Sequence, residues 1–216
     1  MKYGETIFDI AYLLFAIISG ILILKKQNDD VEQMMGRAVL FLGVGDAFHL
    51  IPRIMNYFSK VDVTSLLGIG KFTTSITMTI FYIFIYHIYM EIISKKRRNK
   101  KLTLTVYLLA LVRIILLLLP QNNWMENNSP LYISIIRNIP FILLGAIIIY
   151  LYFKDRSINK EFKNLWLYML LSFLFYIPVV LLSGTYPIIG MLMIPKTFCY
   201  VLIIHVFNKF MNSKIR

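Results

Sequence analysis

A short polar stripe interrupts an apolar run that extends from about residue 38 to residue 58. Asp46, His49 and Arg53 are spaced by three and four residues, so on a helix they fall within about 80° of one another. A charged side chain at the centre of a membrane costs about 2.5 to 3.5 kcal/mol. Several are therefore retained only if they pair with one another or interact with another group there. The stripe therefore marks either a candidate site or a buried structural ion network. The spacing of three and four residues predicts that Arg53 is the nearby counter-charge of Asp46.

Further cations lie in other apolar runs, at depths similar to that of the stripe. They are Arg113, Arg137 and Lys196, which join Arg53 in the half of the runs that we expect to be outermost. Fewer acids are available at this depth, namely Asp46 and Asp9. Arginine presents a planar fork that suits carboxylate or phosphate, so the excess of cations predicts a pocket for an anionic group. The alternative is that single arginines extend to the outer interface.

Hydroxyl and apolar groups accompany these cations. Tyr176 lies on a polar face of the sixth apolar run, and Tyr200 shares a face with Lys196 in the seventh. The many Phe, Leu and Ile side chains nearby would suit a hydrocarbon tail. An anionic amphiphile, such as a phospholipid or lysolipid, fits both properties.

The composition restricts the class of protein. The 216 residues are 58% hydrophobic and only 16% charged, which excludes a disordered chain and an ordinary soluble domain. The formal net charge of +12 would suit nucleic acid, but the basic residues cluster in the connections on one side, so we predict no nucleic-acid partner. Cys199 is the only cysteine, so neither a disulfide framework nor a thiolate metal cluster is expected.

Seven apolar runs are each near the length needed to cross a bilayer. We predict a single all-α domain over residues 1–216, a compact bundle of seven transmembrane helices at about 7–24, 38–58, 72–93, 102–119, 131–153, 162–182 and 186–207.

Basic residues predict the orientation of this bundle. They gather at 25–26, 95–101, 154–163 and 209–216, which lie on one side of the seven runs. Cytoplasmic connections carry the excess of Lys and Arg, so the N-terminus is predicted outside and the C-terminus inside a multi-pass protein of the cytoplasmic membrane. The first run lacks a basic segment before it and a small-residue cleavage site after it, so we interpret it as a span.

The sequence predicts neither zinc nor retinal as a cofactor. Three histidines and an aspartate bind zinc in integral-membrane hydrolases of the ceramidase and adiponectin-receptor type, but His49, His87 and His205 lie at different depths here. A lysine midway along a seventh helix carries retinal in microbial rhodopsins. The third run has no carboxylate at mid-depth to act as the counterion of Lys196.

One local pattern resembles a known family. The pair Gly45-Asp46 and the later His87-Ile88-Tyr89 resemble the Gly-Asp and His-x-x-Tyr signatures of the lysoplasmalogenase-type (YhhN) membrane family. The tyrosine stands one position early, and the Ser-Asp pair of a later span in that family has no counterpart. The resemblance implies that Asp46 is the acid in hydrolysis of a vinyl-ether lipid and that His87 is its polar neighbour.

Two functions follow from these patterns. The first is binding of an anionic amphiphile in an outward-opening pocket, either alone or with hydrolysis near Asp46 and His49. The second is a non-enzymatic transporter or small-molecule receptor for an anionic solute, in which Pro52, Pro140, Pro178 and Pro195 would act as hinges.

Overall fold

The computed structural model describes residues 2–26, 29–94 and 99–214. Seven α-helices account for most of them: α1 (Lys2–Lys26), α2 (Asp30–Phe58), α3 (Thr64–Ile92), α4 (Lys100–Leu118), α5 (Leu131–Lys154), α6 (Leu165–Leu182) and α7 (Met193–Lys214). Short 3-10 helices lie at Pro120–Asn122 (η1), Trp124–Glu126 (η2) and Pro187–Leu192 (η3). In the described part of the chain, seven helical segments are long and apolar enough to cross a membrane. The prediction of an all-helical, multi-pass membrane protein with seven such helices is confirmed.

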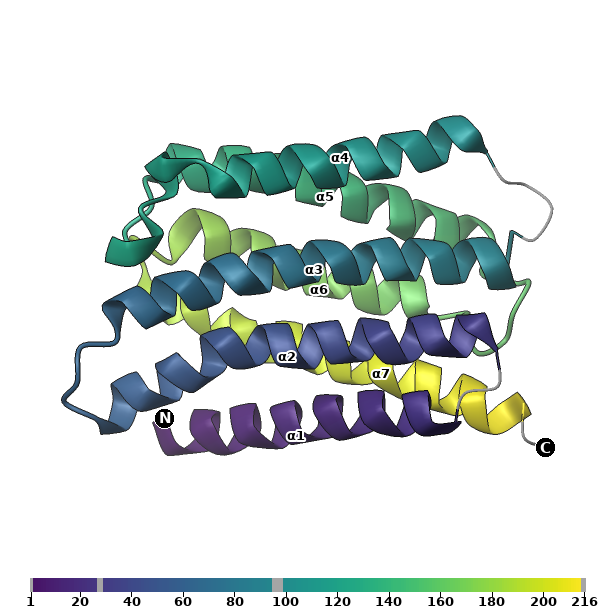
Figure 1. Cartoon of the computed structure of the whole chain (residues 1–216), viewed down its shortest axis with the longest axis horizontal. Coiled ribbons are helices and arrows are strands. Elements are labelled where there is room, and N and C mark those ends of the chain that lie inside the picture. The colour runs from purple at the N-terminus through teal and green to yellow at the C-terminus, as the bar shows by residue number, and fades with distance from the viewer. Residues whose placement is uncertain (1, 27–28, 95–98, 215–216) are drawn as a thin grey trace.

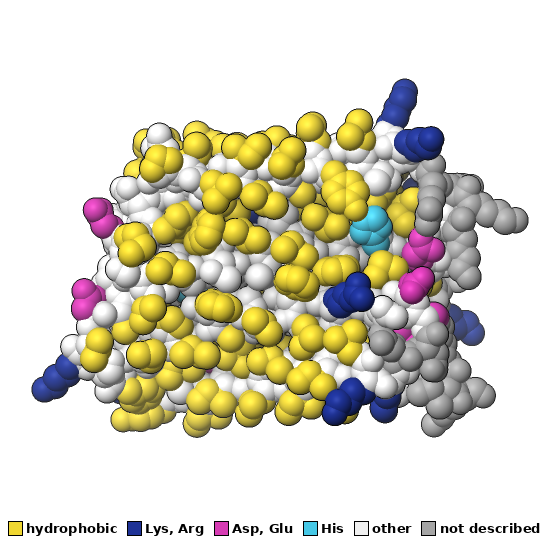
Figure 2. Space-filling view, in the orientation of Figure 1, with side chains coloured by type: hydrophobic (Ala, Val, Ile, Leu, Met, Phe, Trp, Pro, Cys, Tyr) yellow, Lys and Arg dark blue, Asp and Glu magenta, His cyan; other side chains and the backbone are white. Residues whose placement is uncertain are grey.

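The helices lie side by side along one direction, so the connections gather at two ends (Figure 1). The N-terminus, the turn between α2 and α3, the segment with η1 and η2, and the segment with η3 share one end, here called the N-terminal end. The C-terminus lies at the opposite end. On the face shown in Figure 2, an apolar band separates the ends, and most of the visible Lys and Arg side chains lie toward the C-terminal end.

Several helices extend beyond the apolar runs that predicted them. Helices α2 and α3 each begin eight residues earlier than predicted, at Asp30 rather than 38 and at Thr64 rather than 72. Asp29 caps α2, because its side chain accepts a hydrogen bond of 2.9 Å from the backbone of Glu32. Before α3, Asp62 accepts hydrogen bonds from the hydroxyl and backbone of Thr64, which hold the pKa of Asp62 below its ordinary value. A side chain therefore caps the start of α2, whereas α3 follows the Asp62 turn and its N-cap residue, Val63, makes no side-chain hydrogen bond.

The seventh predicted run, 186–207, is divided. Its first residues form the 3-10 helix η3, and α7 begins only at Met193 and continues to Lys214. Pro187 suits the first position of a short helix, where no backbone donor is needed. The sixth helix also begins three residues later than predicted, at Leu165. The connection between α6 and α7 comprises residues 183–192, including η3, and is longer than the three residues between the sixth and seventh predicted runs.

Two glycines let α3 pack closely against the backbones of its neighbours at the N-terminal end of the bundle. A Cβ atom on Gly70 would overlap the backbone carbonyl of Phe48 in α2, and one on Gly68 would overlap the carbonyl of Trp124 in η2. Glycine permits both approaches because it has no Cβ. One turn inward, the Thr74 hydroxyl donates to the carbonyl of Gly45 at 2.8 Å. The first turns of α3 are thereby fixed between α2 and the η1–η2 segment.

Candidate functional site

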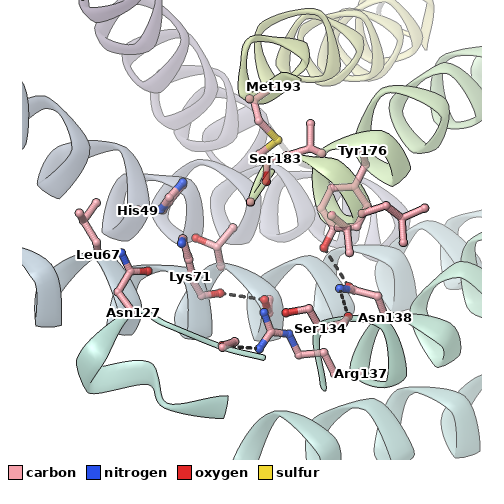
Figure 3. A pocket seen from close by; sticks show the side chains of 18 of the residues that line it. His49, Leu67, Lys71, Asn127, Ser134, Arg137, Asn138, Tyr176, Ser183 and Met193 are labelled. Carbon is pink, nitrogen blue, oxygen red and sulfur yellow. Dashed lines mark hydrogen bonds between the residues drawn. The ribbon is translucent and has the colours of Figure 1, made fainter. Parts of the chain in front are cut away.

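A cavity of about 780 Å³ lies among α2 to α7 at the N-terminal end of the bundle (Figure 3). Most of the predicted site residues line it, namely His49, Arg53, Arg113, Arg137, Tyr176 and Lys196. Lys71, at the start of α3, also lines it. The volume lies within the range of small-molecule pockets in proteins, about 300 to 1,000 Å³.

The lining is unbalanced in charge. Arg53, Lys71, Arg113, Arg137 and Lys196 come from five different helices, and no Asp or Glu is among the described residues that line the cavity. Cationic side chains therefore converge from separate elements on one space. The excess of cations that the sequence predicts at this end is found in the lining of one cavity.

Arg113 on α4 is the most completely buried of these cations. It is 2% exposed, and its guanidinium carbon lies 3.4 Å from the centre of the Phe141 ring. Its Nε and Nη1 atoms have no hydrogen-bond partner among the described residues. A buried charge that lacks a counter-charge costs several kcal/mol, even with a ring face beside it. Arg113 is thus a buried cation in the cavity wall, and two of its nitrogen atoms lack a hydrogen-bond partner among the described residues.

Lys196 on α7 is similarly enclosed. It is 6% exposed, and its ammonium lies 5.3 Å from the ring centre of Tyr176 and 5.0 Å from that of Tyr200. Tyr200 is buried behind Lys196 and is not among the residues that line the cavity. The predicted role of Tyr176 as a lining residue is consistent with the geometry, whereas Tyr200 contacts the lysine from behind.

Arg137 on α5 is largely held by the connection between α4 and α5. Its Nη1 donates to Asn122 Oδ1 at 2.6 Å and to the Ser129 hydroxyl at 2.9 Å, and its guanidinium lies over the Trp124 ring at 4.4 Å. Asn122 in turn donates to the carbonyls of Leu116 and Leu119, both at 2.8 Å. These contacts assign Arg137 a structural part in closing the segment, while leaving it in the cavity wall.

Arg53 has a partner that the sequence did not predict. Its guanidinium forms an ion pair with Glu5 of α1 and donates to the Tyr57 hydroxyl at 3.2 Å. Tyr57 also donates to Glu5 at 2.9 Å. The expectation that Asp46 is the counter-charge of Arg53 is therefore wrong, because the first turn of α1 reaches the guanidinium and helical spacing alone cannot reveal a partner on another helix.

Asp46 is not among the residues that line the cavity. Its Oδ2 accepts a hydrogen bond of 2.6 Å from the Tyr12 hydroxyl of α1, and the residue is 8% exposed. His49, one turn along α2, lines the cavity, and its Nδ1 is buried without a hydrogen-bond partner among the described residues. The two residues predicted near a reacting bond thus face different surroundings.

His87 is remote from this group. Its Nε2 lies 2.7 Å from the Tyr107 hydroxyl of α4, and it is not among the residues that line the cavity. The fold does not bring the predicted hydrolytic set Asp46, His49 and His87 around one enclosed space. Within the described residues, no group of three or more His, Cys, Asp or Glu side chains is placed to hold a metal ion.

Polar and apolar groups complete the walls. The Tyr176 hydroxyl donates to Asn138 Oδ1 at 2.8 Å, and Asn138 Nδ2 donates to the Ser134 carbonyl at 2.8 Å (Figure 3). On α6 and at the start of α7 the lining is largely apolar, with Val179, Val180, Leu181 and Met193. The cavity therefore offers cationic, amide and hydrocarbon surfaces together.

Lys71 lines the cavity, although it precedes the predicted apolar run that begins at residue 72. Helix α3 begins at Thr64, before Lys71, and the exposed Lys71 side chain lines the cavity. The Asp62–Thr64 turn, together with Gly68 and Gly70, could have indicated that the helix begins before Lys71.

Comparisons of the chain with protein-family models, with curated proteins and with solved structures give no match. The resemblance to the lysoplasmalogenase-type family stays a prediction based on the two short patterns around Asp46 and His87.

Proposed function

We propose that this protein binds an anionic amphiphile in the cavity at the N-terminal end of its bundle. The observation that carries the proposal is Arg113: a guanidinium at 2% exposure, with two nitrogen atoms lacking a partner among the described residues, in the wall of a cavity whose described lining holds no acid. An anion in the cavity would supply the missing counter-charge. Charge-assisted hydrogen bonds of this kind are about twice as strong as neutral ones.

The apolar part of the lining favours an amphiphile over a small inorganic anion. Val179, Val180 and Leu181 of α6 contribute a hydrocarbon surface to the lining of the cavity. A phosphate or carboxylate head beside Arg113 and Lys196 would leave a tail free to cover that surface. Burial of a hydrocarbon tail contributes about 0.8 kcal/mol for each methylene group.

The distribution of basic residues supports an outward opening. The connections at the C-terminal end carry most of the Lys and Arg, which is typical of the cytoplasmic side of a membrane protein. We therefore propose that the cavity opens on the outer side of the cytoplasmic membrane. Transport of the ligand, or a response to it, would follow binding there.

Binding rather than hydrolysis is the function that the geometry favours. Of the residues predicted for hydrolysis, only His49 lines the cavity, while Asp46 is outside the lining and is hydrogen-bonded to Tyr12. Hydrolysis needs an acid or a nucleophile within hydrogen-bond reach of the reacting bond. A lysolipid that is incubated with the purified protein should accordingly be recovered intact, and release of a fatty acid or aldehyde would favour the hydrolase.

The binding test compares two lysolipids that differ only in head-group charge. In a neutral detergent, lysophosphatidic acid should raise the melting temperature by several degrees, whereas lysophosphatidylcholine with the same acyl chain should raise it much less. The Arg113→Gln variant should lose most of the rise. Arg156→Gln is the matched control, because Arg156 is exposed and lies outside the cavity lining. Equal stabilisation by both lipids would contradict an anion site.

A further inference from the structure

Two of the cations in the cavity wall rest on aromatic rings that meet each other. The guanidinium carbon of Arg113 lies 3.4 Å from the centre of the Phe141 ring, and the ammonium of Lys196 lies 5.3 Å from the centre of the Tyr176 ring. The two rings meet edge to face, with their centres 6.1 Å apart. All four residues line the cavity, so the two cations belong to one region of its wall.

Hydrogen bonds fix the position of the Tyr176 ring. Its hydroxyl donates to Asn138 Oδ1 at 2.8 Å, and Asn138 Nδ2 donates to the Ser134 carbonyl at 2.8 Å (Figure 3). Asn138 and Ser134 belong to α5, the helix that also carries Phe141. One helix therefore supports both rings and, through them, both cations.

These rings stabilise Arg113 and Lys196 without neutralising them. A ring face attracts a cation through its quadrupole but carries no net charge. The two residues are only 2% and 6% exposed, so water screens their charges poorly. Neither forms an ion pair with a carboxylate among the described residues. Two positive charges in one region of the wall thus lack a counter-charge.

Acids of the first two helices have other partners. Glu5 forms an ion pair with Arg53, and Asp46 accepts a hydrogen bond from the Tyr12 hydroxyl. Neither acid is among the residues that line the cavity. Arg137, which also lines it, donates to the neutral side chains of an asparagine and a serine. The described lining therefore carries a positive charge that a single negative charge would not balance.

We propose that the head group bound in this cavity is a dianion, specifically a phosphate monoester, and that Lys196 supplies the second positive charge beside Arg113. The inference rests on the proposed function and specifies its ligand. A sulfate, a carboxylate or a phosphate diester carries one negative charge and would leave one buried cation uncompensated. A phosphate monoester carries a charge of about −1.5 to −2 at pH 7 and three acceptor oxygens, which suit donors that arrive from separate helices.

Ionisation of the ligand gives this preference a characteristic pH dependence. A phosphate monoester loses its second proton at about pH 6. The dianion predominates above this pH, so affinity should be highest there and should fall as the pH is lowered through it. A sulfate ester keeps one charge over the same range and should show no such loss.

The titratable groups of the described lining are one histidine, His49, with three arginines, two lysines and two tyrosines. Histidine is the side chain of this set that normally titrates in the same range as the phosphate. A proton on His49 would strengthen the binding of either ester as pH falls, which is opposite to the expected loss. The ratio of the two affinities therefore reports the charge of the ligand.

Decyl phosphate and decyl sulfate provide the test, because their tails and tetrahedral heads match and only the charge differs. Isothermal titration of the purified protein in a neutral detergent measures both affinities between about pH 5 and pH 8, on either side of the second ionisation of the phosphate. At the upper end, decyl phosphate should bind about tenfold to a hundredfold more tightly than decyl sulfate, as expected for an added charge-assisted interaction. This ratio should decrease as the pH is lowered below about 6.

Three variants identify the second cation. Lys196→Met removes the charge but keeps an unbranched side chain, so it should lose most of the preference for the phosphate. Lys196→Arg keeps the charge and should retain the preference. Lys60→Met is the matched control, because Lys60 is an exposed lysine in the turn between α2 and α3, outside the cavity lining. It should bind both esters as the unmodified chain does.

The outcomes separate this inference from the proposed function. Equal affinities for the two esters throughout the pH range, in the unmodified chain, would overturn the inference and leave the proposed function standing. An unchanged preference in Lys196→Met, or the same loss in Lys60→Met, would overturn the assignment of the second charge to Lys196. Absence of binding of both esters would overturn the proposed function and the inference with it.

Discussion

Charged side chains have different partners at the two ends of the bundle. Toward the C-terminal end, Lys209 lies 2.9 Å from Glu161 in an ion pair, and Asp155 accepts a hydrogen bond from Tyr89. In the cavity at the N-terminal end, Arg113 and Lys196 are nearly inaccessible, and neither has a carboxylate in an ion pair among the described residues. Arg113 and Lys196 therefore differ from Lys209 at the opposite end, which has a carboxylate partner.

The proposed function explains this difference, because it assigns Arg113 and Lys196 to ligand binding. A protein that needed Arg113 only for stability would gain by replacing it, because apolar residues often serve as well as or better than buried ions. Retention of an uncompensated charge is therefore better explained by something that binds to it. Arg53 shows the contrast within the cavity itself, because Glu5 and Tyr57 already satisfy it.

The largest expected effect follows from Arg113→Met. Removing the guanidinium should weaken binding of lysophosphatidic acid by about tenfold to a hundredfold, because charge-assisted hydrogen bonds contribute about 1.5 to 3 kcal/mol. The ligand-free protein should meanwhile be as stable as before, or more stable by about 1 to 4 kcal/mol. Melting temperature and affinity measured on one preparation check both effects. A variant that is strongly destabilised and binds normally would make Arg113 a structural residue.

A somewhat smaller effect is expected where the N-terminal end is packed most closely. Gly68→Ala places a Cβ against the carbonyl of Trp124, so α3 and the η1–η2 segment must separate. Overpacking of this kind costs about 1 to 3 kcal/mol, which denaturation in mixed micelles can measure. Gly184→Ala, with no atom within 4 Å of the added carbon, is the control and should be nearly neutral. Equal effects of the two variants would show that the segment is not fixed against α3.

The ion pair between Arg53 and Glu5 provides a variant that is expected to raise anion affinity rather than lower it. Glu5→Gln removes the nearest negative charge and makes the cavity more positive. We expect anion affinity to rise by about threefold to tenfold, or about 0.7 to 1.4 kcal/mol at the effective dielectric constant of a partly exposed site. Isothermal titration with decyl sulfonate gives the value. Unchanged or weaker binding would indicate that Arg53 does not act on the anion.

The smallest effect is expected at the C-terminal end. Lys209→Gln breaks the pair with Glu161, but the lysine side chain is 62% exposed. Exposed pairs contribute about 0 to 1 kcal/mol, so stability should change little and anion affinity should not change at all. A loss of affinity comparable to that of Arg113→Met would mean that total charge, rather than the cavity, attracts the ligand.

Much of the fold could be predicted from the sequence, because run length and hydrophobicity follow directly from the thickness of a bilayer. Helix ends were less accessible. The first turn of α2 is polar and is capped by Asp29, and α3 begins directly after a turn in which Asp62 accepts hydrogen bonds from Thr64. The division before Met193 likewise depends on local backbone geometry, which hydropathy does not describe.

Several cations that line the cavity could be selected from the sequence, but their partners could not. The cations at Arg113, Arg137 and Lys196 were identifiable because arginine and lysine in apolar runs are costly and need a reason. Which of them is compensated was not predictable, since Glu5 is 48 positions from Arg53 in sequence and Asn122 is on a separate segment from Arg137. Such pairings depend on how whole helices pack, which side-chain spacing within one helix does not determine.

The most direct test of an anion site in this cavity is competition between two lipids for one protein. Native mass spectrometry of the detergent-solubilised protein, offered equal amounts of lysophosphatidic acid and lysophosphatidylcholine, counts which lipid is retained. We predict preferential retention of lysophosphatidic acid by the unmodified chain and by Arg156→Gln, and loss of this preference in Arg113→Gln. Equal retention of both lipids by the unmodified chain, or an unchanged preference in Arg113→Gln, would contradict the assignment.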